Sequence, residues 1–385
     1  MSTQKRIFMI AGENSGDLHA SNVVKRIKKI DPSIEFHGLG GPQMKQAGVQ
    51  LRANMVEKLA IIGISRVISN FERVWRIFRR TRHFLETHPP DLLILIDYPG
   101  FNLDLIAPAA HKLGIPIIYY ITPQVWAWRK KRIYKIKKYI RKALVVFPFE
   151  EKMYKDIGVD CTYVGHPLLD VMILTMTREQ VFEKFGFDPN KKLIGLLPGS
   201  RKSEVMKILP VMLEAAEIIA NQMKDVQFVI PRASSISQDL IQKYLDETSV
   251  PVKVVDQFRY NVRSALDFVM VASGTATLET ALLVCPMVIL YKVSFLSWAI
   301  GKTFVNIPYI GLANIIAGDM VVPELLQTEC TGQNVANKVL NILRTPDELE
   351  NVRYQLQKVK DKIGGPGASK RAAEEILAIL NARQK

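Results

Sequence analysis

The chain has 385 residues, too many for one ordinary hydrophobic core, and this length favours two domains. Its 48% hydrophobic and 23% charged residues are typical of a globular protein. The longest uncharged apolar run, 281–291, is well short of the ~20 residues that span a bilayer, so we expect no transmembrane helix. The net charge of +15 indicates a polyanionic partner, either nucleic acid or an anionic membrane surface.

The cysteines Cys161, Cys285 and Cys330 lie far apart in the sequence and have no paired spacing. This pattern argues against a disulfide framework and against a zinc site, and buried thiols in a reducing compartment account for it. No signal peptide is recognisable ahead of the first apolar run. We therefore expect the protein in the cytoplasm.

Short apolar runs alternate with amphipathic segments along the N-terminal part of the chain. This alternation predicts a parallel sheet covered by helices on both faces. A second series of the same kind predicts a second doubly wound domain. The predicted strands are 6–11, 35–39, 92–97, 115–121 and 143–147 in the first series, and 193–197, 226–230, 252–255, 268–271 and 287–291 in the second.

The predicted fold class is therefore α/β, with two tandem Rossmann-like domains and a helical C-terminal tail. We place the N-terminal domain at 1–168, a polar linker region at 169–192 and the C-terminal domain at 193–345. The tail, 346–385, is broken by a glycine-rich turn and is expected to pack back on the domains.

Ligands of open parallel sheets bind at the carboxyl ends of the strands, so the loops there hold the candidate site residues. The loop 11–17 after the first strand is rich in glycine but lacks the GxGxxG spacing, which argues against a dinucleotide cofactor. Asp97 ends a buried strand, where a carboxylate is costly to place without a task, and it is the first candidate for a general base. The alternative is a helix cap. Glu13 and His19, on or beside the first loop, are the secondary candidates.

Two segments of the N-terminal domain combine aromatic and basic residues. Residues 61–83 have an apolar stripe at helical spacing with six arginines against one glutamate, which is typical of an interfacial helix. The alternative is a core helix with a solvated basic face. Trp126 and Trp128 precede the run 129–142, in which nine of fourteen residues are Lys or Arg. Such a run fits a lipid headgroup layer or stacked nucleic-acid bases equally well.

The second domain offers two strand ends that suit a phosphate. Gly199, Ser200 and Arg201 form a tight turn before a helix, where Arg201 could pair with the anion, although the lysine of a P-loop is missing.

The second of these strand ends combines Ser273, Gly274 and Thr275, which precede the N-terminus of another predicted helix and its unpaired N–H groups. Glu279 could accept hydrogen bonds from a ribose, and Asn314 follows a further strand end. An ordinary capped turn is the alternative for 272–279.

Four stretches in this order resemble the lipid A disaccharide synthase family: AGENSGD at 11–17, TPQVWAWR at 122–129, LPGSR at 197–201 and ASGTATLE at 272–279. The likeness extends to ELLQ at 324–327, and GGPGASKRAA at 364–373 is similar to the family's tail. The resemblance implies an inverting glycosyltransferase of the B-type fold at the cytoplasmic membrane face. It would join UDP-2,3-diacylglucosamine to 2,3-diacylglucosamine 1-phosphate through a β-1,6 linkage and release UDP.

The resemblance also implies roles for the candidate residues. Asp97 would deprotonate the acceptor hydroxyl, and the C-terminal domain would hold UDP. Residues 61–83 and 126–142 would contact the inner membrane surface. The chain has no Asp-x-Asp motif, so we expect neither a metal nor another cofactor, with Arg201 and a helix terminus meeting the leaving-group charge. Many members carry a second aspartate where this chain has Gly100.

Two rival functions are considered. A soluble UDP-sugar epimerase, or another glycosyltransferase of the same fold, would have no use for the stripe at 61–83. A nucleic-acid-binding protein would use the run 129–142, but no binding module is recognisable, and we expect no nucleic-acid partner. The sequence does not decide between a monomer and a homodimer.

Overall fold

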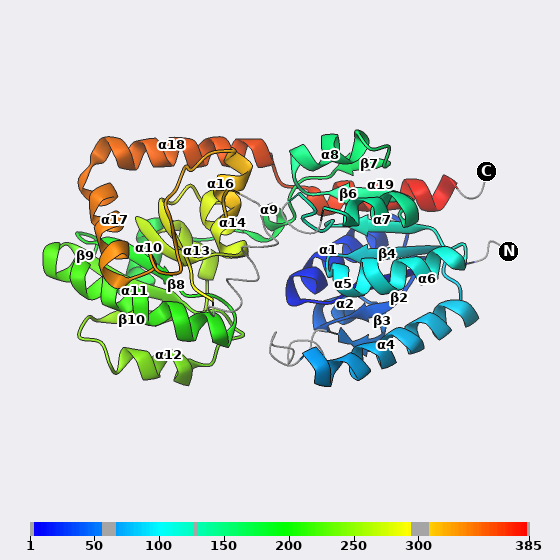
Figure 1. Ribbon diagram of the computed structural model, residues 1–385, viewed down its shortest axis with the longest axis horizontal. Helices are drawn as coiled ribbons and strands as arrows, with labels where there is room; N and C mark the ends of the chain where they lie inside the picture. Colours follow the sequence, from blue (N-terminus) through cyan, green and yellow to red (C-terminus); the bar gives the residue numbers. More distant parts are fainter. Residues whose placement is uncertain (1–3, 56–66, 127–129, 294–307, 383–385) are drawn as a thin grey trace. The chain divides into compact units, whose positions relative to one another are not determined.

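The computed structural model describes residues 4–55, 67–126, 130–293 and 308–382 (Figure 1). The chain forms two compact units. Unit 1 comprises Met1–Asp170 and Gly365–Lys385, and unit 2 comprises Val171–Gly364. The expected tail is therefore divided between them, because α18 (Pro346–Ile363) belongs to unit 2 and α19 (Ala368–Ala382) to unit 1.

Unit 1 is built on a seven-stranded sheet in the order β3-β2-β1-β4-β5-β6-β7. All of its strand pairs are parallel. The strands are β1 (Arg6–Ala11), β2 (Glu35–Gly40), β3 (Gln50–Asn54), β4 (Leu92–Ile96), β5 (Ile117–Tyr120), β6 (Lys142–Val145) and β7 (Cys161–Tyr163).

Helices cover the strands of unit 1 and follow them along the chain (Figure 1). They are α1 (Asn14–Ile30), α2 (Pro42–Gln46), α4 (Val67–Thr87), α5 (Pro99–Phe101), the π-helix η2 (Asn102–Ile106), α6 (Ala107–Lys112), α7 (Arg132–Tyr139), α8 (Pro148–Lys155) and α9 (Leu168–Val171). The last helix, α19, packs beside α1. Lys142 at the start of β6 holds it by an ion pair to Glu375 at 2.9 Å.

The strand order of unit 1 reverses between β1 and β4. From β1 the sheet extends through β2 to the edge strand β3, and from β4 it extends in the opposite direction through β5 and β6 to the edge strand β7. Such a reversal opens a crevice at the carboxyl ends of the two central strands, which is where open α/β sheets bind their ligands. Both strands are almost wholly buried, and Ala11 pairs with Ile96 at their carboxyl ends.

Unit 2 repeats this plan with six parallel strands in the order β10-β9-β8-β11-β12-β13, and its reversal lies between β8 and β11. Its strands are β8 (Lys192–Leu197), β9 (Val226–Pro231), β10 (Val252–Val255), β11 (Phe268–Ala272), β12 (Met287–Tyr291) and β13 (Glu324–Leu326). Its other helices are α10 (Arg178–Phe185), α11 (Lys202–Gln222), α12 (Gln238–Leu245), α13 (Arg259–Ser264), α14 (Thr275–Leu282), α16 (Leu312–Ala317) and α17 (Gly332–Arg344).

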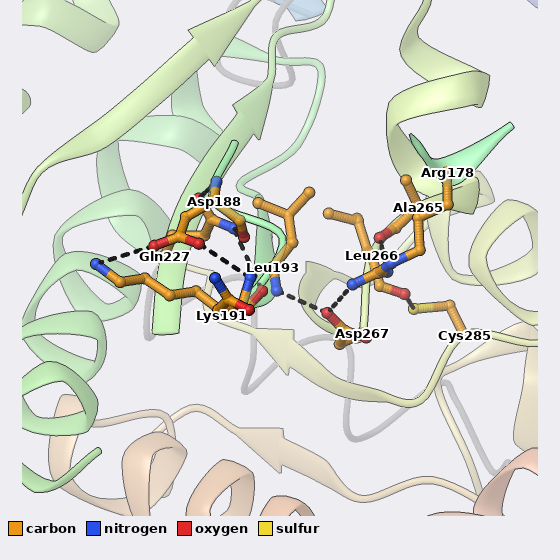
Figure 2. Close-up of polar contacts among 10 residues, drawn as sticks. Arg178, Asp188, Lys191, Leu193, Gln227, Ala265, Leu266, Asp267 and Cys285 are labelled. Carbon is orange, nitrogen blue, oxygen red and sulfur yellow. Dashed lines mark hydrogen bonds and ion pairs between the residues drawn. The ribbon is translucent and has the colours of Figure 1, made fainter. Parts of the chain in front are cut away.

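Most of the expected linker region is an integral part of unit 2. Figure 2 shows Arg178 of α10 donating to the carboxylate of Asp267 at 2.8 Å. The same carboxylate oxygen accepts the N–H of Leu193 at 2.7 Å, so it joins α10 to the start of β8. The boundary between the two units falls at Asp170 and Val171, within α9.

The structure confirms the predicted fold class of two doubly wound sheets with a helical tail. Ten strands lie where the apolar runs place them, and β3, β7 and β13 were not predicted. All three are edge strands, and two of them have only three residues, so neither a long apolar run nor strict alternation marks them. Within the described ranges, no helix is both long and apolar enough to cross a membrane.

Candidate active site

Asp97 follows β4 at the crevice of unit 1, as expected from the sequence. Asp97 and Tyr98 both adopt the left-handed conformation, with φ of 46° and 49°. The main-chain carbonyl of Asp97 accepts two side-chain hydrogen bonds, from Asn102 Nδ2 at 2.8 Å and from the Tyr119 hydroxyl at 2.7 Å. The backbone that carries the carboxylate is thus held from two sides.

Burial raises the pKa of Asp97 to about 6, and the negative charge of Glu13 acts in the same direction. Glu13 is exposed at the N-cap of α1, and it follows β1 as Asp97 follows β4. The two carboxylates therefore face one crevice from adjacent strands. A half-buried carboxylate with this pKa is a stronger base than an ordinary aspartate, yet it is still largely ionised at neutral pH.

His19 lies in the second turn of α1 and is buried. Burial lowers its pKa to about 4, against an opposing effect of Asp170. Burial lowers the pKa of His166 to about 3, and His19 contributes to that shift. The Nδ1 atom of His19 has no hydrogen-bond partner among the described residues. An imidazole with so low a pKa accepts a proton poorly at neutral pH, which favours Asp97 over His19 as the base.

A buried carboxyl group that the sequence analysis missed lies in the first turn of α8, shortly after the end of β6. Glu150 is fully buried, and burial raises its pKa to about 7. It accepts the indole N–H of Trp126 at 3.0 Å and the backbone N–H of Phe147 at 3.1 Å. Its signal in the sequence is the Phe147-Pro-Phe-Glu150 helix start, in which a glutamate at N3 accepts the N–H of the N-cap residue, as in half of a capping box.

In unit 2, the turn after β8 requires Gly199, whose φ of 115° disfavours any residue with a side chain. The carboxylate of Glu204 accepts the N–H groups of Ser200 at 3.1 Å and Arg201 at 3.2 Å. The side chain of Arg201 is 71% exposed and pairs with Glu204 at 3.0 Å. An exposed guanidinium, ion-paired with Glu204, thus lies at the N-terminus of α11, beside backbone donors that the same carboxylate occupies.

The turn after β11 lies next to the turn after β8, because these two strands pair. Gly274 has φ of 153° and is exposed, and Thr275 begins α14. The hydroxyl of Thr277 donates to the carbonyl of Gly274 at 2.8 Å. The predicted phosphate-binding residues Ser200, Arg201 and Ser273–Thr275 are therefore brought to one sheet edge, at the reversal point of unit 2.

Glu279 lies one turn into α14 and is paired with Arg263 of α13. The side chains of Arg263 and Glu279 are only 11% and 15% exposed, so each charge neutralises the other in a dry environment. The hydroxyl of Tyr260 lies 3.5 Å from the second oxygen of Glu279. Arg263 orients the Glu279 carboxylate, which we expect to accept hydrogen bonds from a ribose. Nothing in the sequence around Arg263 indicates this role.

Asn314 uses its whole side chain within the protein. Its amide donates to Val322 and to Glu324, each at 2.8 Å, and its oxygen accepts the N–H groups of Val321 at 2.9 Å and Val322 at 3.0 Å. A carboxamide has two donors and two acceptor sites. All of them are occupied, so Asn314 fixes the segment before β13 in this conformation.

The segment 61–83 is described only from residue 67 onward, and the predicted stripe residues Ile61 and Ile64 lie outside the described part. The second half of α4 follows the core-helix alternative, because Ile77 and Phe78 are buried against the sheet. Trp75 is 42% exposed, and the centroid of its ring lies 5.0 Å from that of Phe78. The exposed arginines of this helix are Arg76, Arg79, Arg80 and Arg82.

The basic run is partly neutralised in α7, where Asp104 pairs with Arg132 at 2.6 Å and with Lys135 at 2.7 Å. Lys130, Lys131, Lys137 and Lys138 are exposed. Trp126 is half-buried, and Trp128 lies outside the described residues. An exposed cationic surface with an aromatic neighbour is thus present at the end of β5.

Solved structures share this architecture over nearly their whole length. The UDP-GlcNAc 2-epimerase from Neisseria meningitidis bound to UDP-GlcNAc has a TM-score of 0.66 at 15% identity, with 97% of this chain and 100% of that chain covered. The calicheamicin glycosyltransferase CalG4 has a TM-score of 0.63 at 14% identity, with 99% of each chain covered. The chain therefore has the two-domain glycosyltransferase B-type fold.

Sequence relatives give the family. A family model described as lipid-A-disaccharide synthetase matches residues 7–379. The lipid-A-disaccharide synthase of Geobacter metallireducens is 40% identical over 380 residues, covering 99% of this chain and 98% of that protein. That of Syntrophus aciditrophicus is 42% identical over 377 residues, covering 98% of both. The chain belongs to the lipid-A-disaccharide synthetase family, and its activity is the disaccharide-forming glycosyl transfer for which the family is named.

Proposed function

We propose that unit 1 binds 2,3-diacylglucosamine 1-phosphate and that Asp97 is the general base of the transfer. Its carboxylate removes the proton of the acceptor 6-hydroxyl as that oxygen bonds to the anomeric carbon of UDP-2,3-diacylglucosamine. The bond from this carbon to the diphosphate breaks on the opposite face, and UDP leaves with the electron pair. The product is the β-1,6-linked disaccharide 1-phosphate. The observation that carries this assignment is the half-buried carboxylate of Asp97 at the reversal point of the sheet, with Glu13 beside it.

The donor site that we propose lies at the corresponding edge of unit 2. Gly199 and the turn Ser273–Thr275 let the diphosphate approach the backbone. Arg201 supplies a fixed positive charge, and its attraction to the leaving group strengthens as negative charge develops there. Glu279 accepts hydrogen bonds from the ribose while Arg263 holds it in place. We propose that no metal ion takes part in this step.

We further propose that the protein works while peripherally bound to the cytoplasmic face of the inner membrane. Both proposed substrates carry acyl chains and phosphate, so they reside in the lipid layer. Support comes from Trp75 with the exposed arginines of α4, and from the exposed lysines around α7.

The test is Asp97→Asn, assayed for disaccharide formation from the two lipid substrates. Asparagine keeps the size of the side chain but cannot accept the proton, so turnover should fall at least about a hundredfold while donor affinity stays unchanged. Asp104→Asn, which alters an ion-paired carboxylate on η2, is the matched control. Near-normal turnover in Asp97→Asn would reassign the base, with Glu13→Gln and His19→Gln as the next variants to assay.

A further inference from the structure

The main chain at Asp97 is strained. Two consecutive residues with side chains, Asp97 and Tyr98, have φ of 46° and 49°. Each left-handed residue other than glycine costs on the order of 1–3 kcal/mol, and such conformations persist only where the surroundings enforce them. The pairing of β4 with β5 supplies one contact to this backbone, in which the N–H of Asp97 donates to the carbonyl of Tyr120 at 3.2 Å. Additional contacts must hold the conformation.

Asn102 supplies one of these contacts from the first position of the π-helix η2. Its Nδ2 group faces three carbonyl oxygens, those of Asp97 at 2.8 Å, Ile96 at 3.1 Å and Ile10 at 3.4 Å. Three acceptors around one atom fix the amide orientation. The side chain therefore ties the end of β4 to the end of β1, the two strands that form the crevice.

The oxygen atom of the Asn102 side chain argues against a purely stabilising role for this residue. Asn102 is fully buried, and its Oδ1 atom has no hydrogen-bond partner among the described residues. An unsatisfied buried acceptor costs about 1–3 kcal/mol. π-Helical turns are themselves unfavourable and occur frequently at functional sites. The local structure thus keeps an expensive arrangement next to Asp97.

Tyr119 supplies the second contact from β5. Its side chain is fully buried, and its hydroxyl donates to the Asp97 carbonyl at 2.7 Å. This carbonyl consequently accepts two hydrogen bonds from two different elements, η2 and β5. Together they fix the position of the carbonyl and hence the direction in which the Asp97 side chain leaves the backbone.

We propose that Asn102 and Tyr119 are positioning residues that clamp the main chain of Asp97 and so aim its carboxylate at the acceptor hydroxyl. This inference rests on the proposed role of Asp97 as the base. A displacement of about 1 Å in a catalytic group can cost about a hundredfold in rate, because the reacting atoms must meet in a narrow geometry. Loss of either clamp should therefore lower kcat and leave donor binding in unit 2 untouched.

The first variant is Tyr119→Phe, which removes one hydroxyl and keeps the ring in the core. We expect kcat to fall about tenfold with the donor KM changed less than about twofold. Tyr120→Phe is the matched control, since Tyr120 is also fully buried in β5 and its hydroxyl makes no contact with Asp97. Its kcat should match that of the parent enzyme.

The second variant, Asn102→Asp, is read from the acid limb of the kcat profile, which a mere loss of folded protein would not move. A carboxylate at this position adds to the negative field of Glu13, which already raises the Asp97 pKa, while the Tyr98 backbone hydrogen bond opposes that shift and Tyr119 is a neutral hydroxyl. The acid limb of the kcat profile should move to higher pH. Simple destabilisation would lower activity equally across the profile and leave that limb in place.

Asp97→Asn is assayed in the same series, so that the two proposals can fail separately. If Asp97→Asn stays active, the base assignment is wrong, and the positioning role of Asn102 and Tyr119 is wrong with it. If Asp97→Asn is inactive while Tyr119→Phe and Asn102→Asp both keep the parent kcat and acid limb, the clamp is wrong and the base assignment stands. Circular dichroism and thermal melting of Tyr119→Phe check the fold, and a parent-like melt with a lowered kcat supports the clamp.

Discussion

The ring of Tyr98 lies directly against the backbone of Gly12. A β-carbon at position 12 would come within 2.5 Å of Cγ of Tyr98, a distance at which one of the two must move. Gly12 follows β1 and Tyr98 follows β4, so the missing side chain lets the two loops of the crevice close on each other. The left-handed backbone of Tyr98 and Asp97 is thus packed from the β1 side as well.

Gly12→Ala should therefore impair the proposed base without unfolding unit 1. The new methyl group displaces the Tyr98 ring, and the adjoining Asp97 moves with it. We expect kcat to fall at least about tenfold with unchanged donor affinity. Gly100→Ala is the matched control, because no heavy atom lies within 4 Å of the β-carbon it adds. Equal activity of the two variants would show that this contact does not position Asp97.

The pKa of Asp97, raised by burial to about 6, predicts the pH dependence of both rate and stability. The base must be ionised, so kcat should decline by about tenfold per pH unit below that value. Because the folded pKa exceeds the ordinary 3.8, the folded state binds this proton more tightly than the unfolded chain does. Ionisation of Asp97 therefore lowers the free energy of unfolding at neutral pH. This loss disappears as the pH falls from about 6 to the ordinary pKa of 3.8.

Asp97→Asn removes that cost along with the activity. The variant should be more stable than the parent at neutral pH, and the difference should narrow as the pH approaches 4, near the ordinary pKa of 3.8. Urea unfolding at neutral and mildly acidic pH measures this difference. A variant that is less stable at neutral pH would mean that the carboxylate makes favourable contacts that offset its burial.

The sequence was sufficient for the buried strands and for placing Asp97, the proposed base, at the end of β4. β4 and β11 are uninterrupted apolar runs, and a carboxylate at the end of such a strand is conspicuous. The clamp on Asp97 could not be predicted, because Asn102 and Tyr119 act on a main-chain carbonyl and no residue pattern marks a left-handed aspartate. Arg263 escaped notice for a similar reason, since its partner Glu279 lies on a different helix.

Membrane binding should depend on Trp75, which is 42% exposed among the arginines of α4. Trp75→Ser should weaken binding to vesicles containing anionic lipid by about tenfold, since it removes much of one large apolar contact. Added salt should weaken both proteins further, because screening acts on the arginines. Tyr354→Ser is the control, as Tyr354 is 59% exposed in unit 2. Equal binding of Trp75→Ser and the parent would favour a helix that only packs on the sheet.

Donor turnover should depend on Arg201 and not on a metal ion. Arg201→Gln should raise the donor KM and lower kcat together, because the cation meets both the bound diphosphate and the charge that develops as it leaves. The combined loss in kcat/KM should be about a hundredfold or more. Lys202→Gln, an exposed charge one residue further on, controls for the general field. Activity that is abolished by EDTA and restored by magnesium would refute the metal-free step.

Asp17 should be a major contributor to the stability of unit 1, although it lies in the first turn of α1, close to Glu13 at the N-cap. It is 1% exposed, and its carboxylate accepts the N–H groups of Gly41 at 2.8 Å, Gln43 at 3.0 Å and Met44 at 3.0 Å. These are the unpaired donors at the start of α2, so Asp17 joins α1 to that helix.

Asp17→Ala leaves these donors without a partner in the protein interior, which should lower the free energy of unfolding of unit 1 by about 3 kcal/mol. Asp31→Ala is the control, because Asp31 accepts the N–H of Ser33 at 3.0 Å in an exposed turn, where water replaces the lost contact. Tryptophan fluorescence during urea unfolding reports on the right unit, since three of the four tryptophans, at 75, 126 and 128, fall within the range of unit 1. Equal midpoints for the two variants would mean that α2 is held by its apolar contacts alone.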